Sequence, residues 1–299
     1  IDCGTNSIRL LIADIAGDNF KEVLRTMEIV RLGQGVDQNK AFHPDAIDRT
    51  LKAVELFRDQ IASKGVEKIR FCATSATRDA TNRNLFTDGV REILGIEVEV
   101  IPGEEEAKLS FIGATKELSQ NEGPFLVVDI GGGSTEFVYG GEKVSAAKSV
   151  NIGCVRMSER HLNQQPPTSA QINAAITDID MAIADAAKVV PISTAQTLVA
   201  VAGTATTVAA AALELPSYDR HAIHLSRISA EKVHKVAAMF QRLTRDEISN
   251  LGYMHPGRVD VITAGALVLS RVMAATGATE FVASESDILD GIAWKLAGE

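Results

Sequence analysis

The chain has few cysteines, few aromatic residues and fewer basic than acidic side chains, and each shortage excludes a class of protein. Three cysteines, at positions 3, 72 and 154 of 299 residues, make neither a disulfide framework nor a CxxC metal site. We therefore expect a protein of the reducing cytoplasm. Lys and Arg total 30 against 39 Asp and Glu, and the net charge of −9 argues against nucleic acid or a membrane surface as a general partner.

An uninterrupted apolar run is also missing. Residues 189–213 carry no charge and are numerous enough to cross a bilayer, but Pro191 and the GTATT run at 203–207 interrupt them. We predict a strand over 197–202, a Gly-Thr turn, and a helix over 206–213. Such a helix start could bind an anion or a nucleotide, although an ordinary buried strand–helix unit explains the pattern equally well.

The segment DIGGGSTE, from Asp129 to Glu136, has the composition of a phosphate and metal site. It follows FLVV, an apolar, β-prone run that predicts a buried strand. Glycines would let the backbone adopt positive φ and approach a ligand, and successive amides in such a turn bind anions. Asp129 and Glu136 offer the carboxylate oxygens that Mg²⁺ prefers, whereas a plain Gly-rich hairpin is the alternative. The candidate phosphate-binding residues here are Gly131, Gly132, Gly133 and Ser134.

A similar segment opens the chain. DCGTNS, from Asp2 to Ser7, repeats the order acid, any residue, glycine, small polar residue and hydroxyl, and an alternating apolar stretch follows it. Its candidate phosphate-binding residues are Gly4, Thr5, Asn6 and Ser7. Asp2 and Asp129 lie close to half the chain length apart, which predicts two duplicated α/β halves with their phosphate loops facing a shared cleft. Cys3, inside the first loop, is a redox-sensitive thiol or, as we favour, a small buried residue.

Strands alternate with amphipathic helices along almost the whole chain, which predicts an α/β fold with mixed sheets. One helix, for example, should begin at Pro44 and end at Lys64, where Gly65 follows. The polar segment SQNEGP at 119–124 marks the expected boundary between domains of residues 1–119 and 120–299. The last helix could still pack back on the first domain.

Three glutamates, Glu104, Glu105 and Glu106, open the helix predicted after Pro102-Gly103. Acids suit a first helical turn because of the helix dipole, and this explains two of the three. A desolvated glutamate could also orient and deprotonate the water that attacks a phosphorus atom. The residues themselves do not choose among the three. Arg78, in the hydroxyl-rich turn ATSATRDATN, is a candidate partner for a phosphate or an ordinary surface arginine.

These motifs together resemble the exopolyphosphatase / guanosine-pentaphosphate phosphohydrolase family, a branch of the actin, sugar kinase and heat-shock chaperone superfamily. The resemblance runs from end to end of the chain. It includes DCGTNSIRLLIAD, DIGGGSTEF, ATSATRDATN, GEEEAKLSFIGA, GTATTVAA, HPGRVDVITAGALVL and SESDILDGIA. Long members of this family add a C-terminal helical domain, and this chain is similar to the short, two-domain form.

The resemblance implies two ribonuclease-H-like (actin-like) domains with a cleft between them, and Glu106 as the catalytic base. It implies hydrolysis of the terminal phosphoanhydride of inorganic polyphosphate or of guanosine pentaphosphate, the latter a reaction of the stringent response. Mg²⁺ would be held by Asp129 and Glu136, with Asp2 as a further possible ligand, and Arg78 would pair with the phosphate. We expect a cytoplasmic homodimer that prefers short polyphosphates because its net charge repels long polyanions.

Two other functions stay open at this point. A sugar or acetate-type kinase would share the loops and would need an adenosine pocket, to which the GTATT run could contribute. A non-enzymatic, actin-like nucleotide sensor would bind without turnover. Five residues could line a polyphosphate path, although each is individually expected to be solvated or a helix cap: Arg156, Arg220, His221, His255 and Arg258. We also expect that the native N-terminus precedes Ile1.

Overall fold

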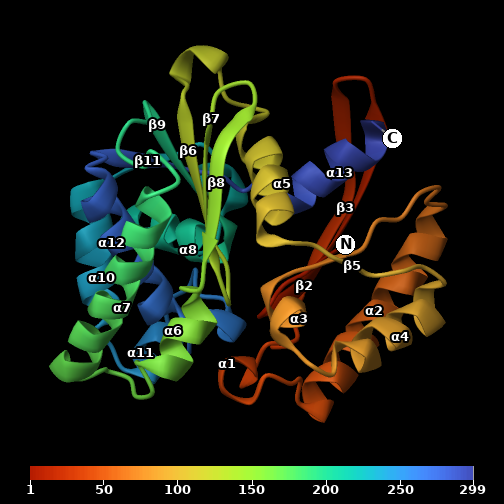
Figure 1. Ribbon diagram of the computed structural model, residues 1–299, viewed down its shortest axis with the longest axis horizontal. Coiled ribbons are helices and arrows are strands. Elements are labelled where there is room, and N and C mark those ends of the chain that lie inside the picture. Colours follow the sequence, from red (N-terminus) through yellow and green to blue (C-terminus); the bar gives the residue numbers. More distant parts are fainter. Residues whose placement is uncertain (299) are drawn as a thin grey trace. The chain divides into compact units, whose positions relative to one another are not determined.

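The computed structural model describes residues 1–298, which form two compact units, each built on one β-sheet (Figure 1). The first unit contains residues 1–113 together with the C-terminal segment from Ile288, and the second contains Ala114–Asp287. The division therefore falls a few residues before the expected boundary at 119. The last helix, α13 (Ile288–Gly298), is part of the first unit.

The sheet of the first unit has the strand order β3-β2-β1-β4-β5. Neighbours are antiparallel from β3 to β1 and parallel from β1 to β5. The strands are β1 (Asp2–Cys3), β2 (Ser7–Ala16), β3 (Asn19–Ile29), β4 (Cys72–Ala73) and β5 (Glu99–Val100). The helices besides α13 are α1 (Val36–Asn39), α2 (Pro44–Lys64), α3 (Ser75–Asp79), α4 (Arg83–Leu94) and α5 (Gly103–Thr115).

The sheet of the second unit has the order β10-β11-β9-β6-β7-β8. Its strands are β6 (Phe125–Ile130), β7 (Thr135–Gly140), β8 (Val144–Val150), β9 (Thr197–Val201), β10 (Arg227–Ser229) and β11 (Glu280–Ala283). Its helices are η1 (Gln120–Glu122), α6 (Cys154–Arg160), α7 (Ser169–Ala187), α8 (Ala202–Ala212), α9 (Arg220–Ile223), α10 (Ala230–Phe240), α11 (Arg245–Ser249), η2 (Pro256–Arg258) and α12 (Ile262–Thr276).

The two sheets are copies of one topology. Read from β8, the order β8-β7-β6-β9-β11 repeats β3-β2-β1-β4-β5, with two antiparallel pairs followed by two parallel pairs in both units. The second unit adds only β10, antiparallel at its edge. The prediction of an α/β fold made of two duplicated halves is confirmed.

Local signals set several boundaries as the sequence predicts. Helix α2 begins after His43, whose side chain accepts the Asp45 N–H, with Pro44 in the first turn, and it ends at Gly65 in the left-handed conformation at φ 63°. Proline suits the first turn because its missing N–H would have no partner there. The predicted bounds of this helix are confirmed.

Buried faces follow the strand and helix periods. Every residue of β6 is buried, so this strand lies inside the core of the second unit. Along the first half of β2 the buried residues alternate, Ile8, Leu10 and Ile12. Helix α13 packs against β2 although the two are distant in sequence (Figure 1).

The uncharged stretch of residues 189–213 contains β9 and then α8. The predicted Gly-Thr turn between them is wrong, because Ala202 alone, at φ 66°, turns the chain and the helix begins there. GTATT therefore forms the first two turns of α8. Among the described residues, the helices are all too short or too polar to cross a membrane.

Candidate active site

The loop between β6 and β7 is held by the first turn of α6. The Cys154 N–H donates to the Gly131 carbonyl at 2.9 Å, and the Val155 and Arg156 N–H groups donate to the Gly132 carbonyl at 2.9 and 3.1 Å. The Arg156 side chain, which is buried, donates from Nε to the Gly133 carbonyl at 2.7 Å. All three glycine carbonyls are thus turned toward α6.

This arrangement decides where the loop amides point. In a trans peptide the C=O of one residue and the N–H of the next point in opposite directions. The amides of Gly132, Gly133 and Ser134 therefore point away from α6. Three consecutive amides on one side of a loop can bind an anion. Phosphate binding by this loop stays a prediction.

Of the two reasons that the sequence suggested for these glycines, positive φ and approach to a ligand, the structure tests the first. Glycines with left-handed φ are Gly17, Gly35, Gly65, Gly95 and Gly277, so the expected positive φ in this loop is wrong. Close approach instead requires a glycine at position 153, where a Cβ would lie 2.2 Å from the Gly132 carbonyl oxygen. Gly153, which the sequence analysis did not select, lets α6 reach the loop.

Asp129 and Glu136 are direct cross-strand partners of the β6–β7 pair. Partners in an antiparallel pair project to the same face of the sheet, with Cβ atoms about 5 Å apart. Both carboxylates are buried, and Glu136 Oε1 accepts the Ser149 hydroxyl of β8 at 2.7 Å. Two buried carboxylates on one face repel each other, and a cation between them would relieve that repulsion.

This pair fits the donor set of Mg²⁺. The described residues contain no cluster of three or more His, Cys, Asp or Glu side chains of the kind that holds a metal by itself. Magnesium, however, commonly binds through one or two carboxylates and completes its coordination with water and substrate phosphate. Asp129 and Glu136 are the residues that would hold it.

The first loop has the same hairpin form but different supports. The Gly4 N–H donates to the Ser7 carbonyl at 2.9 Å, and the Thr5 carbonyl accepts the Gly33 N–H at 2.8 Å. The Asn6 carbonyl accepts two N–H groups, from Val30 and Arg31. The Thr5 hydroxyl is buried without a hydrogen-bond partner in the described part of the chain, and such a group is expected to bind a ligand or water.

Asp2, at the base of this loop, is neutralised by an arginine. Arg9 donates from Nε and Nη2 to Asp2 Oδ2 at 3.0 and 2.6 Å. The other oxygen, Oδ1, is buried and has no hydrogen-bond partner within residues 1–298. One carboxylate oxygen is therefore fixed in position, and the other can accept a bond from a ligand.

Glu106 differs from its two neighbours in a way that only the structure shows. Glu104 is exposed and Glu105 pairs with Lys295, whereas Glu106 is 8% exposed. Burial raises the pKa of the Glu106 carboxyl, opposed by Arg78 and reinforced by the negative charge of Asp2. A buried carboxylate with a raised pKa is suited to accept a proton from water.

Arg78 lies in the short helix α3 rather than in the predicted turn. Its Nη1 donates to Glu106 Oε2 at 2.6 Å and to the Ile101 carbonyl at 2.9 Å. The interpretation of Arg78 as an ordinary surface arginine is wrong, because the guanidinium fixes the Glu106 side chain. Thr74 adds a hydrogen bond to the same carboxyl.

Other polar residues of the sequence analysis have structural roles. His255 caps η2 by accepting the Gly257 N–H, Arg220 pairs with Glu285 at 3.5 Å, and Arg258 Nη1 donates to Thr207 at 3.0 Å. Cys3 is buried, and burial raises its pKa well above the ordinary thiol value, which favours a small core residue over a reactive thiol.

Sequence reasoning missed Arg9 and Thr74. Both stand inside quoted motifs, but only the β1–β2 register and the folding of α3 beside α5 bring them to Asp2 and Glu106. The alternation of β2 was the available signal, since the residue opposite Asp2 in a tight hairpin projects to the same face.

The duplicated topology with a loop after the first strand of each unit defines an actin-like α/β protein. The chain belongs to the Ppx/GppA phosphatase family, whose model matches residues 11–296. The family resemblance in the sequence is therefore confirmed.

Three relatives illustrate this membership. The chain is 44% identical to exopolyphosphatase 2 of Mycobacterium tuberculosis over 311 residues, covering 100% of this chain and 98% of that protein. It is 35% identical to a guanosine-5'-triphosphate,3'-diphosphate pyrophosphatase of Vibrio atlanticus, over 59% of this chain and 35% of that protein. The crystal structure of an exopolyphosphatase-like protein superposes with a TM-score of 0.94 at 44% identity, covering 98% of this chain and 96% of that one.

Proposed function

We propose that this protein is an exopolyphosphatase that removes the terminal phosphate of inorganic polyphosphate by hydrolysis. The observation that carries the proposal is the Glu106 carboxylate, buried beside the first loop, fixed by Arg78 and subject to the charge of Asp2. The similarity to the mycobacterial exopolyphosphatase over both full lengths supports the same reaction.

The residues divide the work of hydrolysis between them. The amides of Gly132, Gly133 and Ser134 bind oxygens of the terminal phosphoryl group, and the first loop (Gly4, Thr5, Asn6 and Ser7) contributes its amides and hydroxyls. Glu106 accepts a proton from the attacking water, whose oxygen forms the new bond to phosphorus while the bridging oxygen leaves with the shortened chain.

Magnesium, held by Asp129 and Glu136, would supply neutralisation of charge on the bridging and leaving oxygens. The fit rests on the two buried carboxylates that face each other across β6 and β7. Arg78 has its Nη1 on Glu106, so in this proposal it positions the base first and contacts phosphate with its remaining donors.

Guanosine pentaphosphate is the second candidate substrate. The Vibrio relative named for guanosine-5'-triphosphate,3'-diphosphate matches this chain over part of its length, which favours the same chemistry on a nucleotide. The terminal phosphoanhydride is identical in kind, so the loops do not by themselves distinguish the two substrates.

The test is orthophosphate release from short polyphosphate, long polyphosphate and guanosine pentaphosphate, each with Mg²⁺ and with EDTA. We expect release from polyphosphate with Mg²⁺ and its loss with EDTA. Release only from the nucleotide would replace the first candidate by the second. Turnover that needs an acceptor and yields a phosphorylated product would identify a kinase, and absence of any turnover would favour a nucleotide sensor.

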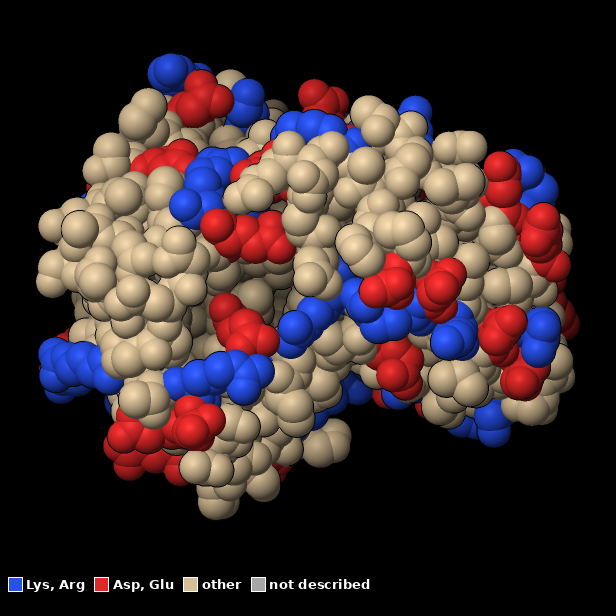
Figure 2. Space-filling view, turned by 90° about the horizontal axis from the view of Figure 1, so that it is seen from below, with Lys and Arg blue, Asp and Glu red and all other residues tan. Residues whose placement is uncertain are grey.

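We propose further that short polyphosphates are preferred. The net charge is −9, and on the face drawn in Figure 2 acidic side chains lie among the basic ones. Repulsion of a long polyanion acts within about a Debye length, roughly 8–10 Å at physiological salt. Comparison of kcat/KM for chains of a few and of several hundred phosphates, at matched concentrations of ends, tests this. A clear advantage of long chains would contradict it.

A cytoplasmic location and a homodimer complete the proposal. The three buried free cysteines suit a reducing compartment. Light scattering of the purified protein over a range of concentrations tests the dimer, and a constant monomer mass would exclude it.

A further inference from the structure

Arg156 is one of two arginines that are buried among residues 1–298, the other being Arg70. It stands in the first turn of α6 and contacts the loop between β6 and β7 twice. Its backbone N–H donates to the Gly132 carbonyl at 3.1 Å, and its side-chain Nε donates to the Gly133 carbonyl at 2.7 Å. One residue thus fixes two successive peptide groups of the loop.

The N–H groups of these two peptides have no partner in the protein. They are the amides of Gly133 and Ser134, and within the described chain neither donates a hydrogen bond. Both residues are buried. A buried N–H without a partner is rare in folded proteins. The two amides are therefore suited to an acceptor outside the chain, such as an anion.

The bond from the Arg156 side chain is of a different kind from the others that hold this loop. Among the three glycine carbonyls, only that of Gly133 accepts a charged donor within residues 1–298. Hydrogen bonds from charged donors are roughly twice as strong as neutral ones. A bond to a carbonyl oxygen also polarises its peptide, which makes the N–H of that peptide a better donor.

We propose that Arg156 is a positioning residue for the anion on this loop and that it acts through the Gly133–Ser134 peptide, without contact. The guanidinium holds this peptide with its N–H directed away from α6 and strengthens the Ser134 N–H as a donor. The inference rests on the proposed function, in which the anion is the terminal phosphoryl group. It gives Arg156 a role other than lining a polyphosphate path.

Two substitutions of similar length separate the charge from the hydrogen bond. In Arg156→Gln the side-chain amide nitrogen is as many bonds from Cα as Nε is, so a neutral donor replaces a charged one. In Arg156→Met a methyl group takes that position and the donor is lost. Neither substitution removes the backbone N–H of residue 156, which donates to Gly132.

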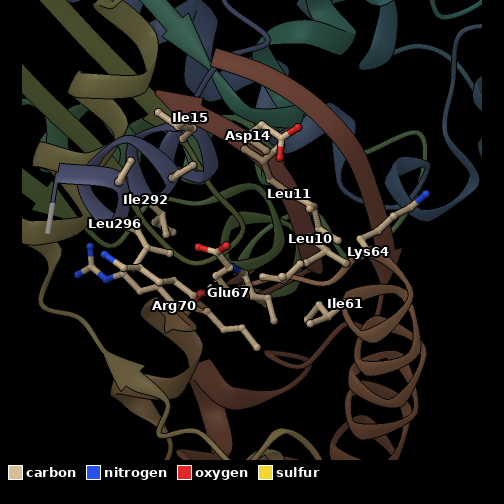
Figure 3. A pocket seen from close by; sticks show the side chains of 18 of the residues that line it. Leu10, Leu11, Asp14, Ile15, Ile61, Lys64, Glu67, Arg70, Ile292 and Leu296 are labelled. Atoms are coloured by element: carbon tan, nitrogen blue, oxygen red, sulfur yellow. Dashed lines mark hydrogen bonds between the residues drawn. The ribbon is translucent and has the colours of Figure 1, made fainter. Parts of the chain in front are cut away.

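Arg70→Met is the matched control, because it removes the other buried arginine. The Arg70 guanidinium donates from Nη2 to Glu99 at 2.9 Å, in the first unit. There Arg70 lines a pocket of about 530 Å³, and no residue of the loop between β6 and β7 lines this pocket (Figure 3). The control therefore removes a buried charge without a change to the Gly133–Ser134 peptide.

The test follows the Ser134 amide by NMR while inorganic phosphate is added. A hydrogen bond at a carbonyl raises the ¹⁵N chemical shift of the amide in the same peptide. We therefore expect this shift to fall in Arg156→Gln and to fall further in Arg156→Met. The dissociation constant of phosphate, from the same titration, should rise by about threefold in Arg156→Gln and about tenfold in Arg156→Met. Both quantities should stay at the wild-type value in Arg70→Met.

An unchanged Ser134 shift in Arg156→Met would overturn the proposal, even with weaker phosphate binding, because the arginine would then act by another route. An equal loss of affinity in Arg70→Met would also overturn it. Circular dichroism checks the fold, and Arg156→Gln decides the result if Arg156→Met does not fold. Release of orthophosphate from polyphosphate by the wild-type protein is measured separately. Its absence would contradict the proposed function alone, whereas release that persists with an unmoved Ser134 amide would contradict only the role of Arg156.

Discussion

The two hairpins of the duplicated units share a register but carry opposite chemistry at the same position. Asp2 at the end of β1 pairs with Arg9 on β2, and Asp129 on β6 pairs with Glu136 on β7. Both partners stand seven residues after the aspartate. In the first unit the partner neutralises the aspartate, whereas in the second it adds another negative charge.

In the proposed mechanism this difference gives the two loops different tasks. The Arg9–Asp2 pair leaves the first loop with little net charge and one carboxylate oxygen that can accept a hydrogen bond, for example from water. The Asp129–Glu136 pair concentrates negative charge where a divalent cation would be stabilised. The two loops that we propose to bind phosphate thus differ in the charge of one cross-strand residue, Arg9 in the first and Glu136 in the second.

The largest effect is expected from replacement of Glu106, the proposed catalytic base. Glu106→Gln keeps the size and the Arg78 contact but cannot accept a proton, so kcat should fall by roughly 10²–10⁴ with KM nearly unchanged. Glu104→Gln, exposed in the same helical turn, is the matched control and should keep the wild-type rate. Steady-state kinetics on short polyphosphate measures both, and an equal loss in the control would refute the role of Glu106.

Activity should be almost as sensitive to Gly153, which lets α6 pack against the second loop. In Gly153→Ala the new Cβ would meet the Gly132 oxygen at 2.2 Å, so the loop or α6 must move by about 1 Å, a displacement that can cost about 10² in kcat/KM. Gly141→Ala has open space for its Cβ and serves as the control. Retained activity in Gly153→Ala, with unchanged circular dichroism, would show that the loop amides are not needed.

The sequence predicted the parts that depend on local chemistry. The duplicated halves, the bounds of α2 and the positions of both loops follow from residue periods, capping and glycine content. The sequence did not predict the contacts between segments that are distant in the chain. The choice of Glu106 by burial, the bond from Arg78 and the support of α6 through Gly153 each arise when segments far apart in the chain pack together.

The α8 start and the φ of the second loop were mispredicted for a related reason. Glycine in a sequence indicates either positive φ or close approach. The loop glycines are not among those with left-handed φ, and the close approach is at Gly153, where α6 packs on the loop. For α8, one non-glycine residue in the left-handed conformation, Ala202, replaced an expected turn of several residues. Such a conformation is rare for alanine, so propensity does not predict it.

Metal dependence sharpens the comparison of the two hairpins. Asp129→Asn and Glu136→Gln should each raise the Mg²⁺ concentration for half-maximal activity by about 10- to 100-fold. The exposed Glu142→Gln, in the next turn, should not. Titration of activity with Mg²⁺ measures this. If Asp2→Asn raised the requirement as much as Asp129→Asn does, both loops would bind metal and the division of tasks would fail.

The smallest effect should appear in the pH profile of Arg9→Gln. Burial already raises the pKa of Glu106, and the charge of Asp2 raises it further. Activity needs the carboxylate form, so it is lost as the pH falls through this pKa, and the acid limb of kcat/KM lies above the ordinary glutamate value. Removal of Arg9 leaves the Asp2 charge uncompensated and should move that limb to higher pH by up to about one unit.

Arg58→Gln, which removes an arginine from a similar but exposed pair with Asp59, should leave the limb in place. An unmoved limb in Arg9→Gln, with the plateau rate retained, would mean that the arginine does not control the charge around Glu106, and that the pairing at Asp2 is structural only.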